Sequence, residues 1–327
     1  MIVAPTAENI DRAARALREG ALVSFPTETV YGLGANARDP DAVRRIFAAK
    51  QRPASHPVIV HVVAASALPR WARSVPPGAR ALAAAFWPGP LTLILPRAPE
   101  VSDTVTGGED SVGLRVPNHP VAQALLQRFV ALGGEGIAAP SANRFGRVSA
   151  TTAQHVADDF GDTIALILDG GACPHGIEST IVAFTTGEPA LLRLGAIPLE
   201  KIAAVLGKAP RPADAGGPRA PGTLASHYAP QTPARLLPPG ELLGALGRHG
   251  SHGAHVAVLA HSVLQPPAFE GAWFDAPAHD AAYAHELYAN LRALDALAAD
   301  EIWIETPPDG PEWSAVRDRL RRATHRD

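Results

Sequence analysis

The sequence contains a single cysteine, Cys173, in 327 residues, so no internal disulfide can form. It also has no apolar run near the roughly 20 residues that a membrane helix needs. The N-terminus, Met-Ile-Val-Ala-Pro-Thr, lacks the basic region and the apolar core of a secretory signal. The net charge of −3 is unsuited to a general nucleic-acid coat. We therefore expect a soluble cytoplasmic protein without membrane contact.

Lysine is scarce: it occurs only at positions 50, 201 and 208, and the other basic residues are arginine. Where a lysine does occur, a role for a compact ammonium group is worth considering. The sequence has neither a Gly-x-x-x-x-Gly-Lys-Ser/Thr phosphate loop nor a Gly-x-Ser-x-Gly elbow. His56 and His61 lack the spacing of a metal pair, so we predict no metal site built from protein side chains.

The composition nevertheless supports real hydrophobic cores, because 46% of the residues are hydrophobic. The length suggests about two domains. A proline- and glycine-rich stretch over 207–233 reads as a stiff, mostly structureless linker. We therefore predict a domain over 1–206, the linker over 207–233, and a small domain over 234–327.

Hydrophobic periodicity predicts the secondary structure of both domains. In the first domain, Thr6 caps a helix that ends at Gly20, and Asp39 caps a second helix that runs to residue 49. Further helices are predicted at 79–86, 119–130, 153–160 and 199–206. Strands are predicted at 21–25, 58–63, 91–95, 112–116, 137–139, 164–168, 180–184 and 190–194. After the linker, strands at 234–237, 256–259 and 302–305 alternate with helices. That order predicts a small α/β domain with a parallel sheet.

The segment Phe25-Pro-Thr-Glu-Thr-Val-Tyr-Gly-Leu-Gly34 combines hydroxyls, a carboxylate and glycines directly after a predicted buried strand. A rigid strand can aim such polar groups into a crevice, which favours a ligand-binding loop. A decorated turn without function explains the same residues equally well. A dinucleotide fingerprint does not fit, because Ala37 stands where its third glycine is needed. We expect Gly32 and Gly34 to give the loop backbone freedom.

Lys50 and Arg52 lie two residues apart where Pro53 ends the second predicted helix. Both cations can point at one anion such as a triphosphate, with the lysine as a point charge and the arginine as a fork. Favourable charge at a helix C-terminus is the alternative explanation.

Arg115 stands at the end of an apolar strand, and Ser111 precedes the same strand. An arginine in that position is costly unless it has an anionic partner. A carboxylate substrate or a structural Asp or Glu would both serve.

Three further segments could line a site. Pro140-Ser-Ala-Asn143 offers a hydroxyl and an amide that could hold phosphates, although serine, asparagine and proline are also ordinary turn residues. Gly176-Ile-Glu-Ser-Thr-Ile181 precedes Arg193, which ends the next predicted strand. Ser226-His-Tyr-Ala-Pro230 places a histidine and an aromatic ring in the predicted linker.

The order of these motifs is more specific than any one of them. Pro-Thr-Glu-Thr-Val-Tyr-Gly-Leu, Lys-x-Arg-Pro, Pro-x-Ile-Val-His, Trp-Pro-Gly-Pro-Leu-Thr, Arg-x-Pro, Ala-Pro-Ser-Ala-Asn, Glu-Ser-Thr-Ile and Leu-Leu-Arg follow one another over residues 6–206. Together they resemble the YrdC-type threonylcarbamoyl-AMP synthases. The later Ser-His-Tyr-Ala-Pro and the extra domain resemble the long, two-domain form of that family.

The resemblance implies a fold and a set of site residues. The fold is a twisted, mostly β core with surrounding helices and a concave pocket, followed by a small Rossmann-like α/β domain. The implied catalytic residues are Lys50 and Arg52. The implied threonine-binding residues are Thr27, His61, Arg115, Ala139 and Ser179. The implied ATP-binding residues are Lys50, Arg52, His56, Ser111, Ser141, Asn143, Ser149, Arg193 and Tyr228. Family members often carry asparagine where this chain has His56, which makes that contact a departure from the pattern.

The resemblance also implies a nucleotidyltransferase that makes threonylcarbamoyl-AMP from threonine, bicarbonate and ATP. Mg²⁺ would accompany the ATP, and the adenylate would pass to downstream tRNA-modifying proteins as the first step of threonylcarbamoyladenosine synthesis. Tyr228 in the linker would close over the nucleotide. An RNA-binding module of the same fold, with at most weak tRNA contact, is the alternative. Against that alternative, aromatic residues are only 6% and there is no dense basic stripe.

Overall fold

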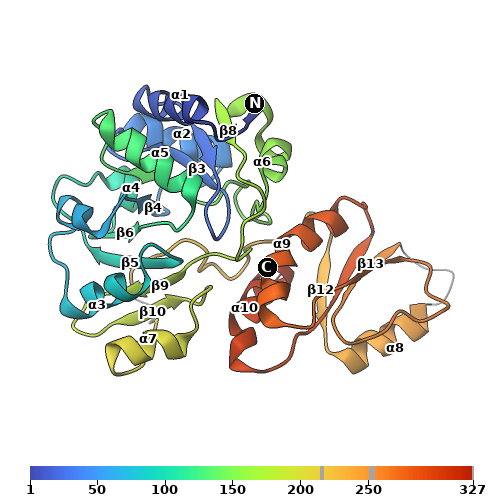
Figure 1. Cartoon of the computed structure of the whole chain (residues 1–327). Helices are drawn as coiled ribbons and strands as arrows, with labels where there is room; N and C mark the ends of the chain where they lie inside the picture. Colours follow the sequence, from blue (N-terminus) through green and yellow to red (C-terminus); the bar gives the residue numbers. More distant parts are fainter. Residues whose placement is uncertain (214–216, 250–254, 326–327) are drawn as a thin grey trace. The chain divides into compact units, whose positions relative to one another are not determined.

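The computed structural model describes residues 1–213, 217–249 and 255–325, and it divides into two compact units (Figure 1). Unit 1 comprises Met1–Phe145 and Ser149–Thr223, and unit 2 comprises Gly146–Val148 and Leu224–Asp327. The division after Thr223 falls inside the segment predicted as a linker, so part of that segment folds with each unit. None of the described helices is long and apolar enough to cross a membrane.

Unit 1 is built on a mixed sheet of eleven strands in the order β1-β8-β2-β3-β7-β4-β6-β5-β9-β10-β11. This mixed α/β arrangement confirms the fold class that the resemblance implied. The strands are β1 (Ile2–Val3), β2 (Val23–Phe25), β3 (Gly32–Asn36), β4 (Ile59–His61), β5 (Leu91–Pro96), β6 (Ser111–Arg115), β7 (Ile137–Ala138), β8 (Leu166–Leu168), β9 (Thr180–Ala183), β10 (Ala190–Arg193) and β11 (Arg211–Pro212). The helices are α1 (Ala7–Arg18), α2 (Pro40–Lys50), α3 (Pro77–Phe86), α4 (Asp103–Thr106), α5 (Pro120–Ala131), α6 (Ala153–Phe160) and α7 (Leu199–Leu206), with 3₁₀ turns η1 (Ala65–Arg70) and η2 (Gly161–Thr163).

Local capping chemistry fixes the two helices that flank the first motif. The Thr6 hydroxyl accepts from the backbone N–H of Asn9 at 3.2 Å and so caps α1. The Asp39 carboxylate accepts from the first backbone N–H groups of α2, and Pro40 occupies its first turn. Gln51 ends α2 in the left-handed region, with φ of 54°. Both predicted helix starts are confirmed.

Three local predictions require correction. The loop predicted over 26–34 is shorter, because its last residues begin β3 and pair with β2 and β7. The glycines Gly32 and Gly34 lie in that strand, where a Cβ at Gly34 would come within 2.9 Å of the Ile137 and Phe25 side chains. Close packing, and not backbone freedom, is therefore the reason for glycine at this position. The segment 207–233 also contains β11, which pairs with β10, so it is less structureless than predicted.

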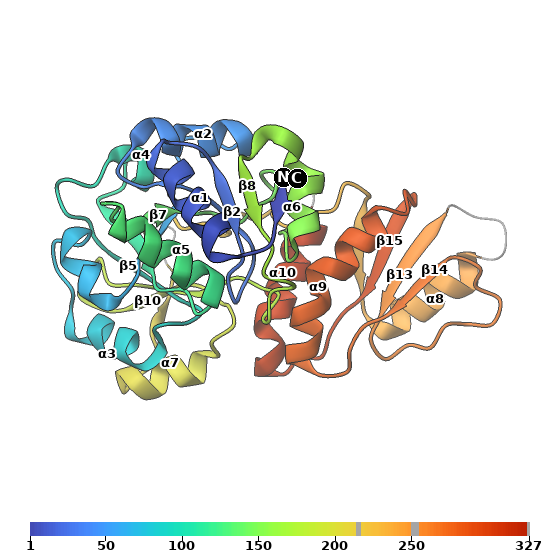
Figure 2. The same ribbon diagram turned by 45° about the horizontal axis from the view of Figure 1, so that its top comes forward.

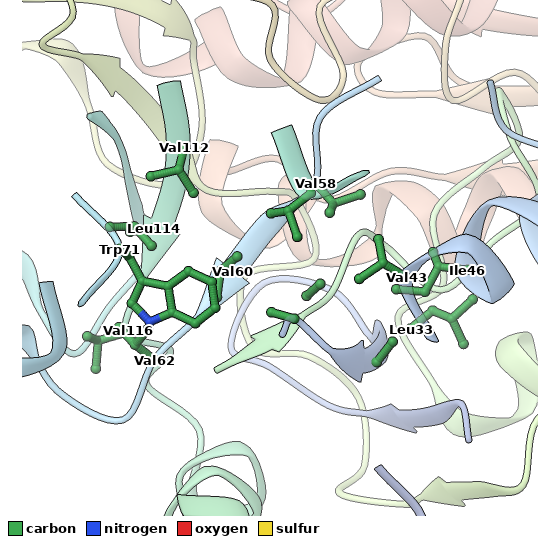
Figure 3. Close-up of a cluster of buried hydrophobic side chains, with 14 of the residues drawn as sticks. Leu33, Val43, Ile46, Val58, Val60, Val62, Trp71, Val112, Leu114 and Val116 are labelled. Atoms are coloured by element: carbon green, nitrogen blue, oxygen red, sulfur yellow. The ribbon is translucent and has the colours of Figure 1, made fainter. Parts of the chain in front are cut away.

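The central strands of unit 1 bury one face in the main hydrophobic core. Trp71 packs there against alternate residues of the neighbouring strands (Figure 3). The labelled members of this layer are Val58, Val60, Val62, Val112, Leu114 and Val116. Because successive side chains of a strand point to opposite faces, the residues between these valines and leucines point to the other face of the sheet. That second face carries the candidate site.

Unit 2 contains a four-stranded, all-parallel sheet in the order β12-β15-β13-β14, which agrees with the predicted parallel α/β arrangement. Its elements are β12 (Ala234–Leu237), α8 (Pro239–His249), β13 (Val256–Ala260), β14 (Ala272–Asp275), α9 (Asp280–Asp295), β15 (Glu301–Glu305), the 3₁₀ turn η3 (Pro311–Trp313) and α10 (Ser314–Thr324). Figure 2 shows α9 and α10 on one side of these strands and α8 on the other. Strand β14 was not predicted, because its short sequence lacks a clear alternation.

Candidate active site

The strand register of unit 1 places several predicted site residues in one row across the sheet. His61 on β4 is the register partner of Arg115 on β6. On the next strand, β5, Thr92 lies beside Arg115, because the adjacent pair is Leu93 with Leu114. Ile181 of β9 then pairs with both Thr92 and Arg193. His61 and Arg193, which are 132 positions apart in the sequence, therefore lie in one row across the sheet.

An apolar floor extends from this row along the strands. Gly113 lies between Arg115 and Ser111, and a Cβ there would come within 3.1 Å of Ile94 and 3.3 Å of Ile59. Ser111 begins β6 on the same face, about 13 Å from Arg115 at about 3.3 Å per residue. The buried side chains of the floor are Ile59, Ile94, Ile181, Ala183, Ala190 and Leu192. The face thus has charged groups at one end, an apolar surface in the middle, and a hydroxyl at the far end.

The loop after β2 is shaped by the hydroxyl of Thr27. This group donates to the carbonyl of Val30 at 2.6 Å and accepts from the backbone N–H groups of Thr29 and Val30 at 3.1 and 3.2 Å. Thr27 is 1% exposed, so these bonds form away from solvent. The predicted threonine-binding residue is therefore first of all the residue that holds its own loop in shape.

Glu28 in the same loop is a site residue that our sequence analysis did not single out. Its Oε1 lies 2.7 Å from Nη2 of Arg115, and both side chains are 5% exposed. Arg115 also donates through Nε to the carbonyl of Gly89 at 3.3 Å. The sequence left two anionic partners possible for Arg115, a substrate carboxylate or a carboxylate of the protein itself. The structure shows a carboxylate of the protein, that of Glu28. The available signal was a carboxylate between two threonines directly after a buried strand.

His61 is buried beside this pair and remains uncharged. Burial, and then the charge of Arg115, lower the pKa of His61 from 6.5 to about 3, although the backbone carbonyls of Ile137 and Ile59 act in the opposite direction. Its ring lies edge-on to Phe25 at a centroid distance of 6.1 Å. Nearby on the sheet, the backbone N–H of Ala139 donates to the carbonyl of Ile59 at 2.9 Å. His61 can therefore donate or accept a hydrogen bond but does not add a charge.

Ser179 and Arg193 form a connected pair at the other end of the row. The Ser179 hydroxyl lies 2.8 Å from that of Thr92 and accepts from Nη2 of Arg193 at 3.1 Å. Arg193 also donates to the Ser179 carbonyl from Nε and Nη2, at 3.1 and 2.9 Å. The structure thus brings together Ser179, predicted for threonine, and Arg193, predicted for ATP.

Lys50 is a buried lysine that organises the predicted phosphate loop. Its Nζ donates to the Ser141 carbonyl at 2.6 Å and to the Asn143 carbonyl. Burial, followed by the nearby charge of Arg52, holds the pKa of Lys50 well below its usual range. The Asn143 amide in turn donates to the carbonyl of Arg144 at 2.8 Å. Lys50 therefore fixes the backbone of residues 141–143.

Arg52 and His56 lie next to each other on the turn after α2. Arg52 donates from Nη2 to the carbonyl of Pro57 at 2.7 Å. His56 packs edge-on against the Phe145 ring at 5.4 Å. Burial, and then the charges of Arg52 and Arg219, lower the pKa of His56. At the position where family members often carry asparagine, His56 therefore contributes a ring contact with Phe145. Because its pKa is lowered, His56 is neutral at any pH above its usual pKa.

Ser149 begins the second stretch of unit 1, directly after residues 146–148. Its hydroxyl donates to Oε1 of Glu178 at 2.7 Å, and both residues are buried. Glu178 and Ser179 directly precede β9, so this bond ties Ser149 to the chain that enters that strand.

Residues 219–223, from the first part of the predicted linker, cover the apolar floor. Ala220 packs into the floor cluster, and the Pro221 carbonyl accepts from Nη1 of Arg193 at 2.8 Å. Arg219 pairs with Glu109 and donates from Nη2 to the Gly107 carbonyl at 3.0 Å. This strap, residues 219–223, belongs to unit 1 and shields the face from solvent.

Tyr228 belongs to unit 2 and packs there against aromatic and cationic side chains. Its ring stacks on Tyr288 at a centroid distance of 5.5 Å, and the Arg319 guanidinium carbon lies 5.4 Å from its centroid. The backbone of Tyr228 is held in the left-handed region, with φ of 63°. These contacts describe Tyr228 as part of unit 2, and its predicted contact with ATP stays a prediction.

No group of three or more His, Cys, Asp or Glu side chains in the described ranges could hold a metal ion. Mg²⁺ prefers to keep several waters and to bind through substrate phosphates with few protein ligands. The Mg²⁺ that the resemblance implies together with ATP therefore stays a prediction.

Comparison with known proteins follows the two-part organisation. Residues 15–195 match the family model described as "Telomere recombination", and residues 197–324 match "Threonylcarbamoyl-AMP synthase, C-terminal domain". The threonylcarbamoyl-AMP synthase of Pyrococcus abyssi is 39% identical over 336 residues, covering 95% of this chain and 93% of that protein. The Bacillus subtilis enzyme of the same name is 40% identical over 326 residues, covering 96% and 92%. A crystal structure of P. abyssi Sua5 complexed with L-threonine superposes with a TM-score of 0.90 and 37% identity, over 99% of this chain and 97% of that one.

Proposed function

The chain belongs to the Sua5/YrdC family of threonylcarbamoyl-AMP synthases, and we propose that it makes threonylcarbamoyl-AMP from threonine, bicarbonate and ATP on the second face of the unit 1 sheet. The observation that carries this proposal is the row of His61, Arg115, Ser179 and Arg193 beside an apolar floor. Cations and hydroxyls at one end suit a carboxylate and phosphates, and the floor suits a flat base.

The reaction asks for positioning and charge stabilisation more than for a covalent catalyst. The threonine amine and bicarbonate give a carbamate, whose oxygen attacks the α-phosphorus of ATP as pyrophosphate leaves. Fixed cations and hydroxyls lower the cost of the charge that develops on the phosphates. Because carbamate and mixed anhydride both decompose in water, the covered floor under residues 219–223 supports the proposal.

The proposed substrate contacts follow the residues that the resemblance implied. A relative, P. abyssi Sua5, was solved in complex with L-threonine. Threonine would contact Thr27, His61, Arg115, the backbone at Ala139, and Ser179. Within unit 1, ATP with its Mg²⁺ would contact Lys50, Arg52, His56, Ser111, Ser141, Asn143, Ser149 and Arg193. The activated product would pass to downstream proteins that modify tRNA.

Two arginines that could favour direct RNA binding, Arg144 and Arg45, donate hydrogen bonds within the protein. Arg144 donates to the Ala49 and Asp159 carbonyls at 2.6 and 2.9 Å. Arg45 donates to the Gly20 carbonyl at 2.6 Å. These bonds occupy guanidinium N–H donors that could otherwise contact a phosphate backbone, so no observation on these two arginines favours RNA binding as the main function.

Pyrophosphate release tests the proposal. We expect release that requires ATP, threonine and bicarbonate together. The Lys50→Ala variant should lose at least about a hundredfold in rate, because the phosphate loop loses the ammonium that fixes two of its carbonyls.

Lys208→Ala is the matched control, because Lys208 pairs with Glu188 on the surface, with side chains 60% and 63% exposed. This variant should keep the wild-type rate. Equal pyrophosphate release without threonine would refute the substrate assignment, and full activity of Lys50→Ala would refute the role of Lys50.

A further inference from the structure

Glu28 and Arg115 are buried and lie at the distance of an ion pair, but the geometry of a hydrogen bond between them is not met. Oε1 and Nη2 are 2.7 Å apart. Within the described part of the chain, however, neither carboxylate oxygen of Glu28 nor Nη2 of Arg115 has a hydrogen-bond partner. Buried charges are normally paired and fully hydrogen-bonded, because desolvation is otherwise costly. A half-satisfied pair in a substrate site therefore points to a ligand that completes it.

A free amino acid has the complementary charges. It is a zwitterion whose carboxylate matches Arg115 and whose ammonium matches Glu28. We propose that Glu28 binds the ammonium of threonine and then accepts its proton, as a base for the first half of the reaction. This inference rests on the proposed function and adds a residue to it.

The surroundings leave Glu28 as the anionic partner for an ammonium. His61 is also buried there without a partner for Nδ1 among the described residues, but burial, and then the charge of Arg115, lower its pKa to about 3, so it is neutral and offers no negative charge to an ammonium. His119 also faces Glu28, and burial lowers its pKa, so it is neutral near pH 7. Burial raises the pKa of the Cys173 thiol to about 12, so this neighbour is protonated and uncharged.

The proton transfer balances as follows. The threonine ammonium gives one proton to the Glu28 carboxylate, and the free amine attacks the carbon of bicarbonate. Water leaves with the bicarbonate hydroxyl and the second N–H proton, which gives the carbamate anion. Glu28 later returns its proton to solvent.

Ligand discrimination tests the ammonium contact directly. The two ligands are L-threonine and its 2-hydroxy analogue, in which a hydroxyl replaces the amine. Calorimetric titration of the full-length protein should show that the wild type prefers threonine by about tenfold or more, which corresponds to one well-placed charged contact. The isosteric Glu28→Gln variant should lose that preference to within about threefold. A merely structural role would weaken both ligands equally.

Glu135→Gln is the matched control, because Glu135 pairs with Arg38 at 2.6 Å and with Arg70 at 3.2 Å outside the site. It should keep the wild-type preference. If Glu28→Gln keeps it as well, Glu28 does not bind the ammonium. If Glu28→Gln does not fold, the wild type still decides the matter, since equal affinity for the two ligands would overturn the proposal.

The rate profile tests the base. Glu28→Gln should lose about 10²- to 10⁴-fold in turnover at pH 7, and its rate should rise toward high pH as free threonine amine becomes available. Glu28→Asp retains a carboxylate, so its turnover at pH 7 should lie between those of the wild type and Glu28→Gln. Threonine-independent pyrophosphate release by the wild type would refute the proposed function itself. Normal wild-type activity together with an unchanged rate profile in Glu28→Gln would refute this inference alone.

Discussion

Single side chains in the site hold its architecture before any substrate arrives. Thr27 closes its own turn through the Val30 carbonyl, Lys50 holds the carbonyls of residues 141 and 143, and Arg193 holds the carbonyl of Ser179. Because these groups are buried and bonded, little reorganisation is needed when charge develops in the reaction. The same groups that a sequence motif assigns to ligands thus have a measurable structural role.

His61 gives the residue scale a pH prediction. Its pKa is about 3 in the folded protein, whereas its ordinary value is 6.5. Between these two pH values, the unfolded chain binds a proton at His61 and the native state does not. The contribution of neutral His61 to the free energy of unfolding is fully present above pH 6.5. It is lost as pH falls toward 3, by up to about 1.4 kcal/mol per pH unit. Urea unfolding of wild type and His61→Gln at pH 7, 5.5 and 4.5 measures it. The free-energy difference between them should shrink as the pH falls, and a constant difference would contradict the prediction.

At the scale of elements, local signals predicted well and non-local ones did not. The caps of α1 and α2 act within a few residues, so Thr6 and Asp39 could be identified directly. The partner of Arg115 lies 87 positions earlier, and only the fold brings Glu28 to it. Likewise, β3 has no alternating pattern, because both of its faces are buried. The motifs could be found from sequence, but the register that aligns them could not.

Gly34 in β3 supplies the prediction for this scale. A Cβ there would come within 2.9 Å of Ile137 Cγ2 and Phe25 Cε1 and within 3.1 Å of the Val23 carbonyl. Gly34→Ala should therefore destabilise the protein by roughly 1–3 kcal/mol through overpacking. Denaturant unfolding measures this. Gly187→Ala is the control, because a Cβ at Gly187 would meet nothing within 4 Å, and equal unfolding free energies for the two variants would count against the packing explanation.

At the scale of the whole molecule, each unit has a hydrophobic core of its own. Each unit also has its own buried polar groups that hold loops in place. In unit 2, the Glu305 carboxylate at the end of β15 accepts from the backbone N–H groups of His261, Ser262 and Val263, at 2.7, 2.8 and 3.0 Å, and from the Ser262 hydroxyl. Those donors follow β13, at the edge where parallel sheets commonly bind ligands. A carboxylate of the chain itself fills this nest of N–H groups. Unit 2 therefore has a structural use for a position that often binds phosphate in such folds.

Glu305→Gln tests whether this carboxylate stabilises unit 2 in particular. Burial alone would raise the pKa of Glu305, but the Ser262 hydroxyl and the three backbone N–H donors outweigh it and lower the pKa. The carboxylate therefore stabilises the fold above its ordinary pKa of 4.5, and this contribution is lost as pH falls through the lowered native value. At pH 7 the variant should lose about 2–3 kcal/mol, since several hydrogen bonds to a charged group weaken at once.

Hydrogen exchange gives this loss a location in the molecule. Peptides from 256–263 and 301–305 should exchange faster in Glu305→Gln, whereas peptides from 23–36 in unit 1 should not change. Glu301→Gln is the control on the same strand, because Glu301 is only partly buried and lies 3.7 Å from Arg235. Faster exchange in both units would mean that they unfold as one cooperative body. Exchange confined to unit 2 would mean that its stability can be altered separately from the sheet face on which we place catalysis.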